Sequence, residues 1–175
     1  MPMIQVEMLA RQTEDAYSWT NKLISSISYD KWDQTPEIIE SNITWQVGHL
    51  IMSFYYHSIM VITGHQMDIL QQIPMKEYDK LFTHAAPVAA IRKTDPAVLH
   101  TQLTLLQHRS LDTIRALSSD DLEKKVEPTR IPHPVATSKF DAIDWNIKHT
   151  MWHCGQIGML KRIIDQRFEF GLKKE

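Results

Sequence analysis

Two segments of the sequence, residues 43–49 and 143–149, place the same kinds of side chain in the same order. Isoleucine, tryptophan, a side-chain amide, a β-branched residue and histidine coincide when the two segments are aligned. The breaks that precede them, at residues 27–32 and 117–122, are also similar. Such self-similarity is typical of a chain built from two related units, although packing alone can bring two apolar helices to the same residue types. We interpret the chain as two related helical hairpins.

The apolar residues between the breaks recur at intervals of three and four, which is typical of amphipathic helices. Sustained alternation of apolar and polar residues is hard to find, and glycine occurs only five times. This pattern predicts an all-α fold, a four-helix bundle made of the two hairpins. We expect helices over residues 4–27, 43–63 and 96–117, and from a start between residues 138 and 141 to residue 168. Asn42 or Ser41, Asp95 and Gly64 are the expected capping and stop residues.

A long crossover, residues 65–93, joins the second and third helices. Pro74 and Pro87 interrupt short amphipathic pieces in it, so we expect one short helix there. If a pseudo-two-fold axis relates the hairpins, the second and fourth helices run in the same direction, and His49 and His149 meet near one end of the bundle. The whole chain, residues 1–175, is most simply a single domain.

Composition excludes several classes of partner. The net charge is -2 and the basic residues are scattered, so we expect no nucleic acid. The most apolar run, residues 50–62, is too short to span a bilayer, so we expect no membrane contact. A single cysteine and the absence of a signal-peptide pattern at the start predict a cytoplasmic location.

Histidines provide the clearest chemical signal. His149 and His153 lie four residues apart on the predicted fourth helix, so both rings can converge on one ion. The repeat adds His49 as the counterpart of His149, whereas Ser53 stands where a counterpart of His153 would be. Three neutral imidazoles suit a divalent ion such as zinc or nickel and leave a coordination position open, as in catalytic sites. Such an ion would acidify a bound water or hold a thiol deprotonated. The simpler alternative is a helix that merely carries two histidines.

Four further residues are candidates for the surroundings of the ion. Gln46 and Asn146 each precede a predicted ligand by three residues and could bond a ring or a bound water, although polar residues also fill space at helix starts. Gln156 lies on the same face as His153 and is expected to line the pocket. His133, in a proline-rich segment, could act as an acid or base at the mouth of the site, although a solvated loop histidine is the simpler interpretation.

Other polar and small residues are assigned structural roles. Cys154 points about 100° away from its neighbouring ligand and is expected to be buried. Gly155 and Gly158 lower the helix propensity, which predicts the close approach of another helix or a ligand. The remaining histidines have no partner at ligand spacing and are expected to be structural or exposed: His57, His65, His84, His100 and His108.

The segments Trp45–His49 and His149–Ile157, with Gly-Gln-Ile after the paired histidines, resemble the DinB/YfiT-like superfamily. The resemblance extends over essentially the whole chain in helix order, but these two segments alone carry diagnostic residues. It implies a four-helix bundle that holds one divalent ion, commonly nickel or zinc, through His49, His149 and His153. Several members of the superfamily are S-transferases that use low-molecular-weight thiols such as bacillithiol or mycothiol. Others are described as hydrolases or have no known activity.

The residues and the resemblance together predict a metal-dependent enzyme that acts on a small molecule, as a thiol-dependent S-transferase or a hydrolase. Nickel or zinc is the expected cofactor, together with a low-molecular-weight thiol in the transferase case. The alternative is a non-catalytic bundle of the stress response that binds a metal or a small molecule. A third hypothesis is a structural dimer of helical hairpins without a metal, and a homodimer is compatible with all three.

Overall fold

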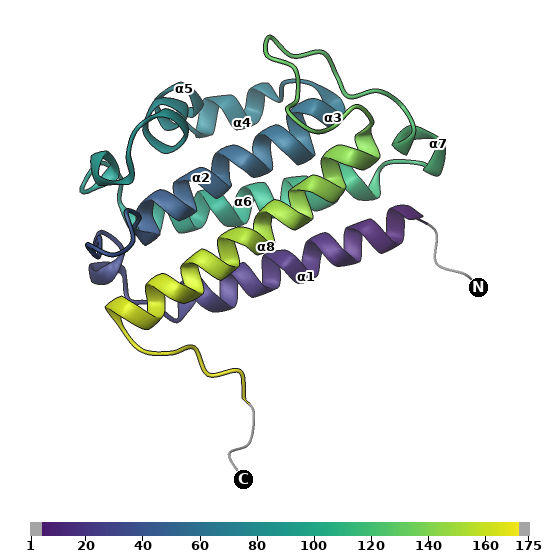
Figure 1. The fold of residues 1–175 in the computed structure, drawn as a ribbon. Helices are drawn as coiled ribbons and strands as arrows, with labels where there is room; N and C mark the ends of the chain where they lie inside the picture. The colour runs from purple at the N-terminus through teal and green to yellow at the C-terminus, as the bar shows by residue number, and fades with distance from the viewer. Residues whose placement is uncertain (1–4, 172–175) are drawn as a thin grey trace.

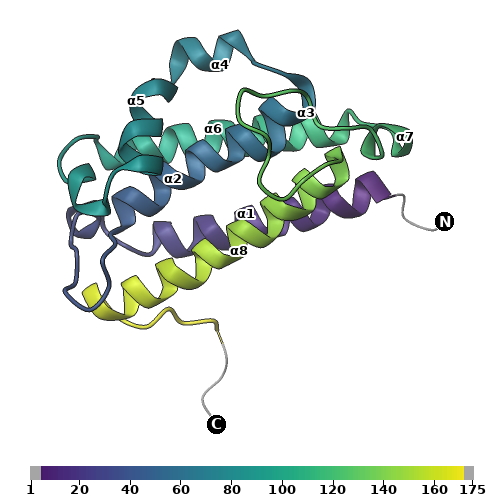
Figure 2. The same cartoon turned by 45° about the horizontal axis from the view of Figure 1, so that its top comes forward.

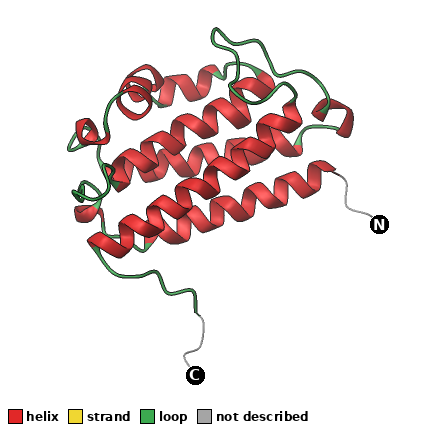
Figure 3. Cartoon of the chain, in the orientation of Figure 1, coloured by secondary structure: helices red, strands yellow, loops and turns green. Residues whose placement is uncertain are grey.

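The computed structural model describes residues 5–171, and within this range the chain forms helices and no strand. The long helices lie side by side, and the short helices α4 (Met67–Gln72) and α5 (Met75–Asp79) lie along the second of them (Figures 1 and 3). The long elements are α1 (Gln5–Ser25), α2 (Ile43–Tyr55), α6 (Pro96–Arg115) and α8 (Lys139–Ile164). The all-α prediction is confirmed. The predicted start of the first helix at Ile4 and the tail Lys173–Glu175 lie outside the described residues.

Local capping chemistry explains where the long helices begin. The Asn42 side chain accepts the backbone N–H of Trp45 at 2.8 Å, and Asp95 caps α6, whose first residue is Pro96. A reciprocal pair of bonds between Ser138 and Asp141 forms a capping box at the start of α8. The predicted starts are therefore confirmed, whereas α8 ends four residues before the predicted end.

The second long helix changes geometry along its length. After α2 comes the π-helical turn η2 (Tyr56–Met60) and then α3 (Val61–Thr63). The helix stops at Gly64, whose φ of 84° lies in the region that favours glycine. The predicted span of residues 43–63 is confirmed, but the π-helical turn inside it was not predicted.

The crossover contains more helical structure than expected. It consists of α4 (Met67–Gln72), α5 (Met75–Asp79), the π-helical turn η3 (Lys80–His84) and the 3₁₀ turn η4 (Pro87–Ala90). The prediction of one short helix was wrong. This segment runs back along α2, as Figure 2 shows, and the side-chain amide of Asn42 donates to the Pro87 carbonyl at 3.0 Å. The chain thus returns to the start of α2 before α6 begins.

The direction of the helices differs from the prediction. Gln46 bonds Gln156, and the ring of His57 lies beside that of His149, so residue numbers rise along α2 as they fall along α8. The two helices are therefore antiparallel, and the expectation that they run in the same direction was wrong. The crossover causes this arrangement. It returns the chain to the start of α2, so α6 runs parallel to α2, and the connection between α6 and α8 then reverses the direction of the chain. A two-fold axis that relates the hairpins would therefore be perpendicular to the long helices. His49 and His149 nevertheless meet, as predicted, with ring centroids 5.4 Å apart.

The short connections complete the chain. The turn η1 (Tyr29–Lys31) lies between α1 and α2, and α7 (Ser119–Leu122) lies between α6 and α8. None of the helices within residues 5–171 is both long and apolar enough to cross a membrane.

One packing contact in the core positions the site directly. A Cβ added to Gly48 of α2 would lie 2.4 Å from the ring of Phe82, which is fully buried. The absence of a side chain at Gly48 therefore lets η3 pack against the backbone of α2. Burying a phenylalanine contributes roughly 1.5–3 kcal/mol to stability, so this contact is a substantial anchor for the crossover.

Candidate metal centre

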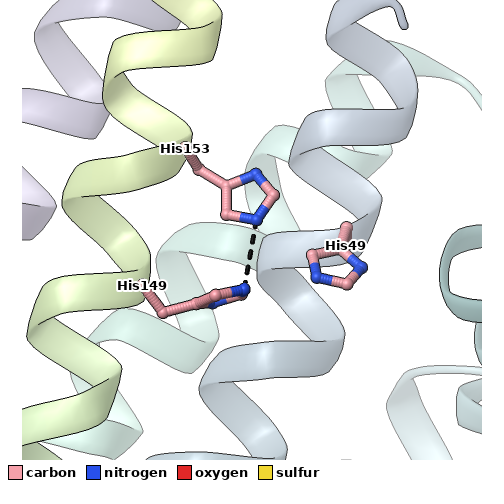
Figure 4. A group of neighbouring side chains, drawn as sticks. All are labelled: His49, His149 and His153. Carbon is pink, nitrogen blue, oxygen red and sulfur yellow. Dashed lines mark hydrogen bonds between the residues drawn. The ribbon is translucent and has the colours of Figure 1, made fainter. Parts of the chain in front are cut away.

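The three histidines predicted as ligands lie together between α2 and α8 (Figure 4). One nitrogen of each ring lies within 4.8 Å of one nitrogen of each of the others. The Nε2 atoms of His149 and His153 are 3.2 Å apart. The ring of His49 reaches them from the facing helix, with centroids 5.4 Å and 4.9 Å away. This group could hold a metal ion.

The tautomer of His49 follows from its hydrogen bond to the crossover. Nδ1 of His49 lies 2.7 Å from the carbonyl oxygen of Phe82. A carbonyl oxygen only accepts hydrogen bonds, so Nδ1 carries the proton and Nε2 keeps its lone pair. The contact between Gly48 and Phe82 therefore prepares a ligand nitrogen one residue away.

The tautomer of His153 follows from a buried amide. Nε2 of Gln46 donates to Ser41 and to Gln156, each at 2.9 Å, which leaves its Oε1 as the acceptor facing His153. Nδ1 of His153 donates to that oxygen, so Nε2 of His153 also keeps its lone pair. Such partners around a ligand histidine fix the ring and its tautomer. The antiparallel arrangement of α2 and α8 is what brings Gln46 to His153 rather than to His149.

The position and the hydrogen bonds of His149 indicate whether the group fits a metal ion. Its Nδ1 is buried and has no partner among residues 5–171, and its Nε2 can donate to Nε2 of His153. Nitrogens about 2.0–2.1 Å from a tetrahedral zinc ion lie roughly 3.3 Å apart, close to the 3.2 Å observed here. The spacing of this pair fits zinc or nickel, and the third ring lies within 4.8 Å of both. A bound ion would replace the proton shared by the two Nε2 atoms.

Two tryptophans stack on the ligand rings in the pattern of the internal repeat. Trp45 stacks on His49 with centroids 4.9 Å apart, and Trp145 stacks on His149 at 5.9 Å. Each pair spans one turn of its own helix. The repeat recognised in the sequence therefore places a tryptophan against one ligand histidine on α2 and against one on α8.

The surroundings keep the three rings neutral. Burial, together with the smaller effect of the neighbouring histidines, lowers the pKa of His153 to about 2 and that of His149 to about 4. Burial also lowers the pKa of His49, although the Phe82 carbonyl acts in the opposite direction. Neutral imidazole is the form that binds a metal, so the site is ready for an ion at neutral pH.

The structure brings some of the other predicted residues to the centre and not others. Gln46 contacts His153, and Gln156 lies at the exposed edge as the partner of Gln46. Asn146 is fully buried and donates to the hydroxyl of Tyr17 at 3.0 Å, so it faces α1.

The predictions for the cysteine and the two glycines have different outcomes. Cys154 is buried beside Thr20 of α1, as expected, and burial raises the pKa of its thiol. A Cβ at Gly155 or Gly158 would meet no atom of the described chain within 4 Å, so the predicted close approach is not found there.

One histidine that sequence reasoning set aside lies next to the centre. His57 is 8% exposed, its Nδ1 is 2.7 Å from Nε2 of His133, and its ring centroid is 5.6 Å from that of His149. The sequence predicted a structural or exposed position for His57 because no histidine lies at ligand spacing from it, and its contact with His133 was not predicted. A signal was present, because His49, Ser53 and His57 recur every four residues on one face, but its meaning depends on the antiparallel direction of α8.

Comparisons with known proteins agree with this architecture. Residues 12–157, more than half of the chain, match the DinB superfamily. A conserved protein from Enterococcus faecalis, known from a crystal structure, has a similar fold with a TM-score of 0.70. The similarity covers 93% of this chain and 98% of that one at 11% sequence identity, so it shows the fold alone. No curated protein was found to match the chain.

Proposed function

Because the chain belongs to the DinB superfamily, we propose that it is a metal-dependent enzyme that acts on a small molecule, as a thiol-dependent S-transferase or a hydrolase. One observation carries the proposal: the Nδ1 atoms of His49 and His153 have fixed acceptors, so both Nε2 lone pairs are prepared for an ion. Ligands held in this way require little reorganisation on binding.

The residues of the chain have distinct parts in this proposal. His49, His149 and His153 would hold the ion, while Phe82 and Gln46 orient two of the rings. A bound zinc or nickel ion would supply positive charge that stabilises a thiolate or a developing oxyanion. The three ligands are neutral, so none of them offsets that charge. Exposed Gln156 marks the edge at which a substrate would enter.

Metal content is the first test. Protein purified without a metal-affinity tag and loaded with zinc or nickel is expected to hold about one ion per chain by elemental analysis. His153→Ala should lose the ion. His65→Ala, which removes an exposed histidine bonded to Tyr55, should keep it. Less than about 0.2 ions per chain in the unmodified protein would count against a metal site.

Activity separates an enzyme from a binding protein. The loaded protein is expected to join a bacterial thiol such as bacillithiol or mycothiol to an electrophilic acceptor, or to hydrolyse an ester, and His153→Ala should not. If neither reaction occurs while a small molecule raises the melting temperature, the non-catalytic alternative replaces the enzyme.

A further inference from the structure

A second pair of histidines lies beside the three ligands. His57 belongs to the π-helical turn η2, and His133 lies in the connection between α7 and α8. Nδ1 of His57 is 2.7 Å from Nε2 of His133, so one proton lies between the two rings. π-Helical turns inside α-helices frequently occur at functional sites, and this one carries His57.

The backbone of the connection fixes the tautomer of His133. Nδ1 of His133 accepts the backbone N–H of Ala136 at 2.9 Å and that of Val135 at 3.3 Å. Because Nδ1 accepts, it carries no proton, and the ring must carry its proton on Nε2. Nε2 of His133 therefore donates to Nδ1 of His57.

The tautomer of His57 follows in turn. Its Nδ1 accepts from His133, so its own proton is on Nε2, on the other side of the ring from His133. No group within residues 5–171 accepts a hydrogen bond from this Nε2. The ring stands nearly perpendicular to that of His149, with an angle of 70° and centroids 5.6 Å apart. The ring that carries this neutral N–H donor thus lies next to the metal centre.

Further contacts hold His133 in place. The ring of Tyr56 stacks on His133 with centroids 5.3 Å apart and an angle of 3°. At the two ends of the connection, the backbone N–H of Glu127 donates to Val61 at 2.8 Å and the Lys139 ammonium donates to Ile62 at 2.6 Å. The connection is therefore tied to the end of the second long helix on both sides of His133.

We propose that His57 donates a hydrogen bond from Nε2 to an oxygen of the substrate at the metal centre, and that His133 is the positioning residue that fixes this tautomer. The inference rests on the proposed function. An N–H donor beside a cation suits a substrate with a carboxylate or carbonyl group, because one oxygen can face the ion while a lone pair accepts from His57.

The tautomer can be read directly in the metal-free protein from the ¹⁵N chemical shifts of the histidine rings. His57 is expected to show a protonated Nε2 and an unprotonated Nδ1. His133→Ala should convert His57 to a mixture of tautomers, whereas His65→Ala should leave it unchanged. A proton on Nδ1 of His57 in the unmodified protein would overturn the inference, whether or not the protein binds a metal.

The donor role can be measured with acetate as a probe and visible absorption of the cobalt-loaded protein as the readout. His57→Ala should weaken acetate binding about tenfold, the equivalent of one hydrogen bond, with unchanged cobalt affinity. His57→Gln, which keeps a side-chain N–H, should restore most of the loss. His133→Ala should also weaken acetate binding, although it still contains His57. This second variant tests the donor role even if His57→Ala fails to fold.

Two outcomes would contradict the proposed role. Equal acetate affinity in the unmodified protein and His57→Ala would show that Nε2 binds nothing there. Loss of cobalt from His57→Ala would show that His57 is itself a ligand. Failure of the unmodified protein to bind cobalt would instead overturn the proposed function, and the ring shifts of the metal-free protein would still report the tautomer.

Discussion

At the scale of single residues, Gln46 links the two long helices that carry the histidines. It is fully buried, its amide nitrogen donates to Ser41 and Gln156, and its oxygen accepts from His153. A buried amide with all these bonds made has one stable orientation. Its counterpart in the repeat, Asn146, bonds Tyr17 instead, so two equivalent positions of the sequence have different roles.

This difference gives a matched pair of substitutions. Gln46→Ala is expected to lower metal affinity about 10- to 100-fold, because His153 loses the acceptor that fixes its tautomer. Asn146→Ala is expected to lower the free energy of unfolding by about 1 kcal/mol or more, with little change in metal affinity. Competition with a chelator gives the affinity and urea unfolding gives the stability. Equal metal affinities in the two variants would contradict the role given to Gln46.

At the scale of elements, the packing of the crossover on α2 connects the fold to the site. Phe82 of η3 lies against Gly48, and its carbonyl accepts from His49. These two contacts fix the position of the crossover next to the ligand His49. The outer face of α8 is different, since Gly155 has no neighbour within 4 Å of an added Cβ.

Alanine at these two glycines should therefore have opposite effects. Gly48→Ala is expected to reduce the free energy of unfolding by about 1–3 kcal/mol, because the new methyl group overlaps the Phe82 ring. It is also expected to weaken metal binding, because it moves the Phe82 carbonyl that accepts from His49. Gly155→Ala is expected to gain up to about 1 kcal/mol from helix propensity. Thermal unfolding and metal titration measure both effects. A loss of stability at Gly155 would indicate that another molecule packs on this face.

At the scale of the whole molecule, histidines are concentrated in one region. Five of the nine line the space between α2 and α8 or its edge: His49, His57, His133, His149 and His153. Burial is the largest cause of a lowered pKa in each of them. The folded protein therefore resists protonation at a group of sites that the unfolded chain protonates readily.

The consequence is a dependence of stability on pH. Burial lowers the pKa of His57 and His153 to about 2, while an unfolded histidine titrates near pH 6.5. Below pH 6.5 the unfolded chain binds more protons than the folded one, so the free energy of unfolding decreases as the pH falls. Each of these two rings should contribute a slope that approaches about 1.4 kcal/mol per pH unit well below pH 6.5, where the unfolded histidine is fully protonated.

Urea unfolding of the metal-free protein between about pH 7 and pH 5 measures this slope. His153→Gln removes one of the rings and should reduce the mean slope over this range by about 1 kcal/mol per pH unit. A stability that stays constant over this range would show that the rings are accessible to protons in the folded protein.

Much of the architecture could be predicted because it depends on local rules. The helix starts follow from capping residues such as Asn42 and Asp95, and the pairing of His149 with His153 follows from the pitch of one helix. The repeat added His49 because the same residue types serve the same packing on both hairpins. The sequence by itself therefore determined the four long helical segments and the three histidines that lie together.

Only the tertiary structure decided how the helices run and what surrounds the histidines. The return path of the crossover depends on the contact of Phe82 with Gly48, which joins residues far apart in the chain. That path makes α8 antiparallel to α2, and this direction brings Gln46 to His153 and His57 beside His149. Helical spacing sets which side chains share a face of one helix, but the partners across two helices depend on their direction and register, which long-range packing fixes.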